Sequence, residues 1–229
     1  TVDLRIGKEI LKGVADSYRR LRNSMRFILG NLAGFTEAER VSPAEMPELE
    51  RWVLHRLAVL DARVREGYAS YDFQGVFQDL FTFCTSDLSA VYFDIRKDSL
   101  YCDAPTSLTR RACRTVLDLL YQRLTTWLAP ILTFTMEEIW LCRNPGEESS
   151  VHLQDFPETP ASWRDDALAA KWDGIRWGNV GGPSVGDPDG PILAMVSGDG
   201  EEIIAGGDFT RWGGKNLQRL ARWDGAVWN

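Results

Sequence analysis

The sequence has few of the residues that build metal centres and nucleophilic active sites. Its 229 residues contain two histidines, His55 and His152. Two histidines leave little material for a histidine-based metal site or for a Ser-His-Asp triad. His55 falls within a helical pattern, so we expect it to be structural or to lie on the surface. We therefore expect no catalytic residue and no metal ligand in this chain.

The cysteines are also sparse, and no pair of them has the C-x-x-C spacing of a zinc ribbon; the four are Cys84, Cys102, Cys113 and Cys142. The N-terminal residues lack the continuous apolar stretch of a signal peptide. We therefore expect a cytoplasmic protein whose cysteines are reduced and lie in the core. No apolar run approaches the roughly 20 residues that span a bilayer, so we expect no membrane partner.

Positive charge is in deficit overall but concentrated in one place. The net charge of −7 argues against a protein that binds nucleic acid by bulk charge. For nucleic-acid binding, the distribution of charge over the chain matters more than the net charge. Near the N-terminus, seven basic residues stand against only Glu9 and Asp16, a local charge of +5; they are Arg5, Lys8, Lys12, Arg19, Arg20, Arg22 and Arg26. This cluster is either a solvated helix face or a surface for a polyanion.

Apolar residues recur at three- and four-residue steps over long segments, which predicts amphipathic helices. The expected helices run over about 9–32, 47–68, 72–97 and 107–128, followed by a short fifth helix and another near 162–177. The segment 72–97 is apolar over a wide arc, so we expect it to be the central helix. Long helices with short connections form an antiparallel bundle.

The stretch 127–140, WLAPILTFTMEEIW, predicts a helical corner. Pro130 cannot continue a helix, because it lacks the backbone donor and clashes with the preceding turn. Thr135 followed three residues later by Glu138 has the spacing of a capping box, which predicts the start of the next helix. The tryptophans and the apolar residues between them predict a packing element and not a binding site.

Beyond residue 178 the chain changes character, because glycine becomes dense and helical periodicity ends. Asp-Gly pairs at 189, 199 and 224 are turn signals, and short β-type runs lie at 192–196, 202–205 and 217–223. The fold class is therefore mainly α, an antiparallel helix bundle followed by a short antiparallel β segment. The expected domains are a helical domain at 1–160, a connecting helix at 161–177 and a Gly-rich β segment at 178–229.

Strings spread over residues 3–176 resemble the anticodon-binding helical region of bacterial isoleucyl-tRNA synthetases, which are class I enzymes. The strings, in order, are DLRIG at 3–7, YRRLRNSMRF at 18–27, RWVLHRL at 51–57, YDF at 71–73, YFDIRKD at 92–98, the corner at 127–140 and VHL at 151–153. The chain departs from the family at Ser99, where arginine is usual, and at Thr133, where proline is common. Several strings in the family's order are more specific than any one of them.

The resemblance implies a bundle that grips the anticodon side of tRNA for isoleucine. A stem is bound through its phosphates by Lys and Arg, whereas unpaired bases need hydrogen-bonding and stacking partners. The candidate tRNA-binding residues fall into three groups. Arg19, Arg22 and Arg26 share a helix face and could follow one backbone; Arg5, Lys8 and Lys12 lie nearer the catalytic half of the parent enzyme. Arg96 and Lys97 lie at a helix end and are either structural or RNA-binding.

The catalytic parts of the parent enzyme do not appear in this sequence. Neither the HIGH string nor the KMSKS string occurs, and Gly214-Lys215-Asn216 is not a P-loop. Whether this chain is an enzyme is therefore uncertain, and alone it is not expected to activate isoleucine. We expect no cofactor in it, because ATP and Mg²⁺ belong to the catalytic core, which is the expected partner besides tRNA.

The tail resembles one repeat of a β-propeller, through the pattern GGDFT at 206–210, GG at 213–214 and RLARWDG at 219–225. The heptapeptide at 171–177 (KWDGIRW) echoes the one at 222–228 (RWDGAVW). The two resemblances meet at this string, which indicates a chimera: a natural fusion, a gene fragment or a deliberate fusion. The alternative function is a non-catalytic interaction protein whose β tail binds a protein or a polysaccharide.

Overall fold

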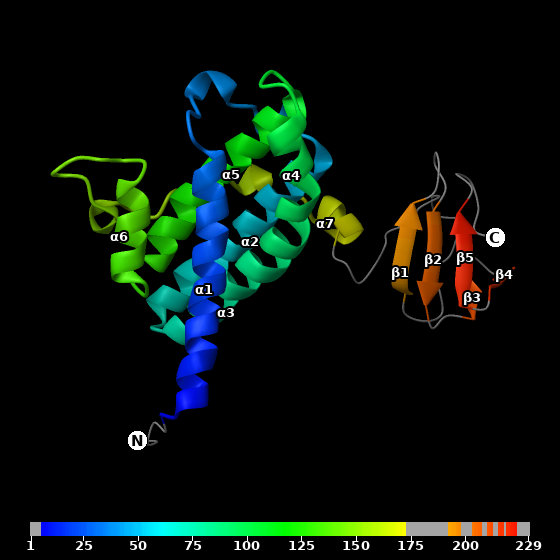
Figure 1. The fold of residues 1–229 in the computed structure, drawn as a ribbon, viewed down its shortest axis with the longest axis horizontal. Coiled ribbons are helices and arrows are strands. Elements are labelled where there is room, and N and C mark those ends of the chain that lie inside the picture. Colours follow the sequence, from blue (N-terminus) through cyan, green and yellow to red (C-terminus); the bar gives the residue numbers. More distant parts are fainter. Residues whose placement is uncertain are drawn as a thin grey trace. The chain divides into compact units, whose positions relative to one another are not determined.

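The computed structural model describes residues 6–172, 192–197, 203–207, 210–212, 215–217 and 219–223. The chain forms two compact units, Thr1–Asp166 and Ala167–Asn229, and the division falls within the predicted connecting segment 161–177. The first unit is helical and the second contains the β-strands (Figure 1). The predicted fold class, a helix bundle followed by a short antiparallel β segment, is confirmed. No helix within the described ranges has both the length and the apolarity needed to cross a bilayer.

The helical unit contains the helices that the periodicity predicts, with one of them divided. Its elements are α1 (Lys8–Asn31), α2 (Glu48–Ala69), α3 (Phe73–Thr82), a π-helix (Phe83–Tyr92), α4 (Phe93–Cys102), α5 (Leu108–Leu128) and α6 (Thr133–Leu141). Short 3-10 turns lie at Glu37–Glu39, Pro43–Glu45, Val151–Leu153 and Ala161–Trp163. The expected helix at 72–97 is therefore a continuous helical segment in three parts, widened in its middle by the π-helix.

Helix α5 is the centre of the bundle, so the prediction that the segment 72–97 is central is wrong. Helix α5 packs against α1, α2, α3, α4 and α6. Its side chains are buried almost without interruption from Ala112 to Leu128, whereas Phe73 and Ile95 of the α3–α4 segment are about half exposed. Trp127 is fully buried, and burying one large apolar side chain contributes roughly 1.5–3 kcal/mol.

The corner after α5 has the predicted proline stop but not the predicted capping box. Helix α5 ends at Leu128, and Pro130 follows in the turn. Helix α6 begins at Thr133, before the predicted cap, and no side chain caps it. The hydroxyl of Thr135 instead forms a hydrogen bond of 2.9 Å with the Tyr18 hydroxyl on α1. Phe134 does not join the apolar mass of the corner, because it is 90% exposed.

The cysteines and His55 are placed as structural groups. All four cysteines are unbridged, as expected. Cys84 and Cys113 are buried, but Cys102 and Cys142 are exposed, so the expectation of core positions is wrong for these two. The Nδ1 atom of buried His55 accepts a hydrogen bond of 2.9 Å from the Asp165 backbone N–H. His55 thus ties α2 to the end of the helical unit.

The described part of the second unit is built from short antiparallel strands that follow α7 (Asp166–Trp172) along the chain. A three-stranded sheet has the order β1-β2-β5, with β1 at Ile192–Ser197, β2 at Ile203–Gly207 and β5 at Leu220–Trp223. Strands β3 (Arg211–Trp212) and β4 (Lys215–Asn216) form a separate pair. The small residues Ala205 and Ala221 face each other across β2 and β5 and are both buried. Most of the repeated heptapeptide lies outside the described residues.

Candidate nucleic-acid interface

The basic residues of α1 form a stripe along one side of the helix. At about 100° per residue, Lys8, Lys12, Arg19, Arg22 and Arg26 fall within an arc of about 80°. All five are exposed. Lys8 and Arg26 are 18 positions apart, which corresponds to about 27 Å along the helix axis. Arg5, the remaining candidate near the N-terminus, lies outside the described residues.

The stripe cations differ in how they are paired. Arg19 forms an exposed ion pair of 3.1 Å with Asp16 on the same helix. Arg22 donates to both carboxylate oxygens of Glu138 on α6, at 2.8 and 3.1 Å. For Lys8, Lys12 and Arg26, no ion pair is found with any part of the chain that the structure describes. The stripe therefore offers both unpaired and exchangeable positive charge.

A groove of about 750 Å³ lies between the C-terminal half of α1, the loop after it and α6. Leu29, Leu32 and Ile139 give it an apolar part. Its polar lining comes from Arg22, Asn23, Arg26, Glu138 and Arg143. The end of the basic stripe thus opens into a hollow with three guanidinium groups, one carboxylate and one amide.

The Arg22–Glu138 pair forms one wall of this groove and belongs to a small network. Arg22 also donates to the Tyr18 hydroxyl at 3.3 Å, and that hydroxyl bonds Thr135. The hydrogen bonds from Arg22 hold the pKa of the Glu138 carboxyl below its usual range, and the same pairing raises the pKa of Arg22. Both groups are therefore charged at neutral pH, and the network aligns α1 with α6.

The loop after α1 closes one end of the groove. Gly34 adopts a φ of +68°, a left-handed conformation that glycine accepts without steric cost. The next residue, Phe35, lines the groove and has the guanidinium groups of Arg40 and Arg114 at 5.5 and 5.6 Å from its ring centroid. Arg114 also donates to the Ala33 carbonyl at 2.9 Å. These contacts fix the loop against α5.

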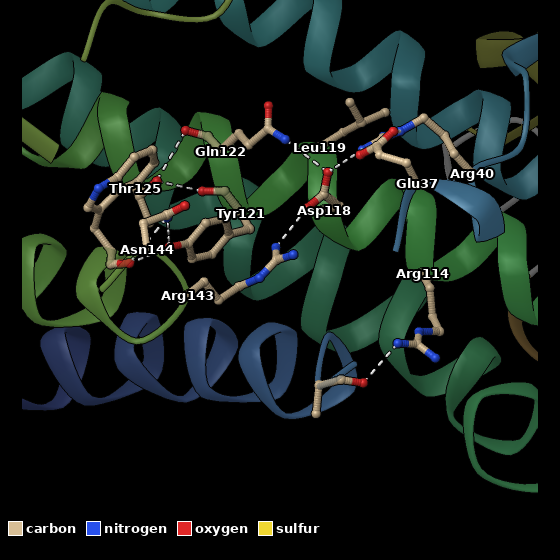
Figure 2. Close-up of polar contacts among 12 residues, drawn as sticks. Glu37, Arg40, Arg114, Asp118, Leu119, Tyr121, Gln122, Thr125, Arg143 and Asn144 are labelled. Carbon is tan, nitrogen blue, oxygen red and sulfur yellow. Dashed lines mark hydrogen bonds and ion pairs between the residues drawn. The ribbon is translucent and has the colours of Figure 1, made fainter. Parts of the chain in front are cut away.

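A buried carboxylate positions the third arginine of the groove (Figure 2). Asp118 of α5 accepts hydrogen bonds from Arg143 at 2.7 Å, from Arg40 at 2.8 Å and from Gln122 at 2.9 Å. The Arg143 guanidinium also lies 4.9 Å from the ring centroid of Tyr121, whose pKa burial raises to about 12. Asp118 therefore joins the loop, α5 and the end of α6, and it holds Arg143 at the groove.

Phe134 is an exposed aromatic side chain on α6, the helix that carries Glu138 of the groove wall. It precedes Glu138 by four residues, so the two share a face of α6. With 90% of its surface exposed, it makes little contribution to the core. An exposed ring beside a basic groove can stack on an unpaired base.

Arg96 and Lys97 were predicted together but are placed very differently. Arg96 donates to both carboxylate oxygens of Glu50, at 2.6 and 2.7 Å, and Glu50 is fully buried. Arg96 is thus held in a structural ion pair of the bundle, which is one of the two roles expected of it, and its contact with RNA stays a prediction. Lys97 is exposed and forms an ion pair of 2.7 Å with Asp94. Its predicted contact with RNA stays a prediction.

Glu138 and Arg143 line the groove, and the sequence did not reveal them as candidate site residues. Glu138 has the spacing of a capping box, and its true partner Arg22 is 116 positions away. The side chain of Arg143, which lines the groove, is held by Asp118, 25 positions before it in the sequence. In the described ranges, no cluster of three or more His, Cys, Asp or Glu side chains could hold a metal ion.

The helical fold is that of an anticodon-binding domain. The family model described as the anticodon-binding domain of tRNA ligase matches residues 50–176, which is more than half of the chain. The chain therefore belongs to this family.

Isoleucine–tRNA ligases are among the curated proteins that this chain resembles. The enzyme of Ruegeria pomeroyi is 73% identical over 166 residues, which are 72% of this chain and 17% of that protein. Those of Gluconobacter oxydans and Agrobacterium fabrum are 53% and 54% identical over 174 residues, 76% of this chain and 18% of each. The predicted resemblance to the isoleucine enzyme is confirmed. The chain spans less than a fifth of the length of these relatives.

Proposed function

We propose that the helical unit binds the anticodon side of tRNA for isoleucine and serves as the tRNA-positioning module of an isoleucine–tRNA ligase. The observation that carries the proposal is the basic stripe of α1, which ends in a groove lined by Arg22, Arg26 and Arg143. Membership of the anticodon-binding family and the names of the relatives support it.

The stripe and the groove suit the two parts of an RNA hairpin. Lys and Arg side chains bind phosphates and set the position of a stem, as Arg19, Arg22 and Arg26 would along one strand. Unpaired bases are recognised by hydrogen bonds to their edges and by stacking. The Asn23 amide in the groove and the exposed ring of Phe134 supply groups of these two kinds.

The N-terminal turns of α1 suit contact with the rest of a synthetase. Figure 1 shows them extending beyond the other helices of the bundle. They carry the apolar side chains of Ile10, Leu11 and Val14, which are 56–62% exposed, and Ile6, just before the helix, is 66% exposed. In this proposal the catalytic core covers that apolar side and supplies the ATP and Mg²⁺ chemistry, while Lys8 and Lys12, together with Arg5, contact the tRNA close to it.

Filter binding with tRNA for isoleucine, and with a noncognate tRNA at matched salt, tests the proposal. The wild-type chain should prefer the isoleucine tRNA. The triple variant Arg19→Glu/Arg22→Glu/Arg26→Glu should bind it far more weakly, and the slope of log K against log salt should fall by about three.

Arg20→Glu is the matched control, because Arg20 lies on α1 but outside the stripe and pairs with Asp16 at 3.1 Å. It should reduce affinity much less than any single reversal within the stripe. Equal binding by the wild type and the triple variant, or no preference of the wild type for the isoleucine tRNA, would reject the proposal.

A further inference from the structure

Glu138 is an acidic residue in the wall of a groove that is otherwise basic. Its carboxylate occupies both arms of the Arg22 guanidinium, at 2.8 and 3.1 Å. The two side chains are 45% and 58% exposed. An ion pair this exposed contributes little to the stability of a fold. Its main effect is therefore on the charge that the groove presents to a ligand.

The carboxylate occupies the place that a phosphate of the ligand would take. A guanidinium binds carboxylate and phosphate with the same two-pronged geometry. The Tyr18 hydroxyl, which is hydrogen-bonded to Thr135, also accepts from Nη1 of Arg22, the nitrogen that donates to one oxygen of Glu138. Arg22 is thus already oriented for an anion, but an incoming phosphate must displace Glu138.

We propose that Glu138 is a specificity-determining residue of the groove, which occupies Arg22 until a correctly positioned phosphate replaces it. This inference rests on the proposed function. An RNA anchored elsewhere along the stripe, by Lys8, Lys12 and Arg26, brings its phosphate to Arg22 at high effective concentration. An RNA without that fit either leaves Arg22 paired or places a phosphate beside a carboxylate, and such like-charge contact suppresses wrong partners.

Glu138→Gln tests the inference in the full chain, because glutamine keeps the shape of glutamate and removes its charge. We would titrate wild type and variant with tRNA for isoleucine, with a noncognate tRNA and with poly(U), each at several salt concentrations. The variant should bind the noncognate RNAs about threefold to tenfold more tightly, with a salt slope steeper by about one. Its affinity for the isoleucine tRNA should rise less, so its selectivity should fall.

Two further variants separate this role from a merely structural one. Glu45→Gln removes an exposed carboxylate that does not line the groove, and it should leave the selectivity unchanged. In an Arg22→Gln background, Glu138→Gln should have little further effect, because no Arg22 remains to be released. If Glu138→Gln alone does not fold, a gain of affinity for the noncognate RNAs in the double variant over Arg22→Gln would still overturn the inference.

The outcomes distinguish the inference from the proposed function. If the wild type binds the isoleucine tRNA selectively but Glu138→Gln keeps the same selectivity and salt slope, Glu138 is only a clamp between helices and the inference is wrong. A gain of the same size with and without Arg22 would also overturn it. If the wild type shows no selective tRNA binding, the proposed function itself fails.

Discussion

Two arginine–carboxylate pairs of this chain have the same chemistry and opposite surroundings. In the bundle interior, Arg96 donates to Glu50 at 2.6 and 2.7 Å. At the groove, Arg22 donates to Glu138 at 2.8 and 3.1 Å. The interior side chains are 15% and 0% exposed, and those at the groove are 45% and 58% exposed. The comparison teaches that burial, and not residue type, separates an arginine that is committed to the fold from one that a ligand can reach.

The difference follows from desolvation. The Glu50 carboxylate has lost its water, and its hydrogen bonds come from Arg96 and from the Tyr92 hydroxyl at 3.2 Å. Breaking such a pair leaves a buried charge without compensation. Glu138 can exchange Arg22 for water at little cost, and Arg22 can exchange Glu138 for a phosphate. Only the groove pair is therefore available to a ligand.

The largest expected effect comes from breaking the interior pair. Arg96→Gln should lower the free energy of unfolding by about 3–5 kcal/mol, because it leaves Glu50 buried and unpaired. Urea denaturation followed by circular dichroism measures the loss. Arg22→Gln is the matched control and should cost less than about 1 kcal/mol. Equal losses in the two variants would remove the distinction between the pairs.

The helices were predictable because their signal is local. Leu21, Met25 and Ile28 recur at helical steps and are all fully buried in α1. Asp72 is the first residue of the expected helix 72–97, and its side chain accepts a hydrogen bond of 2.9 Å from the Gly75 N–H, as a helix cap does. Both patterns lie within a few residues of chain, where periodicity and capping chemistry act.

What the sequence did not reveal depends on residues that are far apart along it. The central position of α5 follows from the helices that surround it, and its own pattern resembles that of its neighbours. Arg96 and Lys97 are adjacent and alike, but Glu50, which is 46 positions from Arg96, decides the role of only one of them. Glu138 was assigned to a local cap because its partner Arg22 is distant.

A second interior contact should respond to pH. Burial holds the pKa of His55 below its ordinary value of 6.5, against the attraction of Asp166 and with the repulsion of Arg56 and Arg164. The unfolded chain then binds a proton that the folded chain resists. This contribution to stability is complete above pH 6.5 and is lost as the pH falls towards the lowered pKa of the folded state.

Urea denaturation between pH 8 and pH 5 measures this dependence. His55→Asn should flatten the part of the profile below pH 6.5, and at pH 8 it should cost about 0.5–1.5 kcal/mol for the hydrogen bond from the Asp165 N–H. His152→Asn is the control, because His152 is exposed. An unchanged slope in His55→Asn would assign the pH dependence to other groups.

At the groove, the removal of one unpaired cation should change binding and leave stability unaltered. Arg26→Gln should weaken binding of tRNA for isoleucine by about threefold to tenfold and lower the salt slope by about one. Its free energy of unfolding should stay within about 0.5 kcal/mol of the wild type, since Arg26 is exposed. Arg20→Gln, on the same helix outside the stripe, should leave both measurements nearly unchanged. If Arg26→Gln lowered the free energy of unfolding as much as Arg96→Gln, Arg26 would be a structural residue like Arg96.

The smallest effect is expected for a substitution of Lys97, the residue that directly follows Arg96 in the sequence. Lys97 follows Arg96 but points about 100° away around α4. It shares a face with Phe93, whose ring stacks at 4.3 Å on Phe27, the neighbour of Arg26. Lys97 therefore lies on the side of α4 that faces α1. There its positive charge would weakly attract an RNA bound along the stripe.

Lys97→Gln should weaken tRNA binding by about twofold, because a single exposed charge near the interface contributes little at physiological salt. Its free energy of unfolding should change by less than about 0.5 kcal/mol, since the pair with Asp94 is exposed on both sides. Filter binding and urea denaturation on Lys97→Gln and Arg96→Gln, measured side by side, separate the two roles over a single residue. A stability loss of several kcal/mol in Lys97→Gln would mean that burial does not explain the different roles of Arg96 and Lys97.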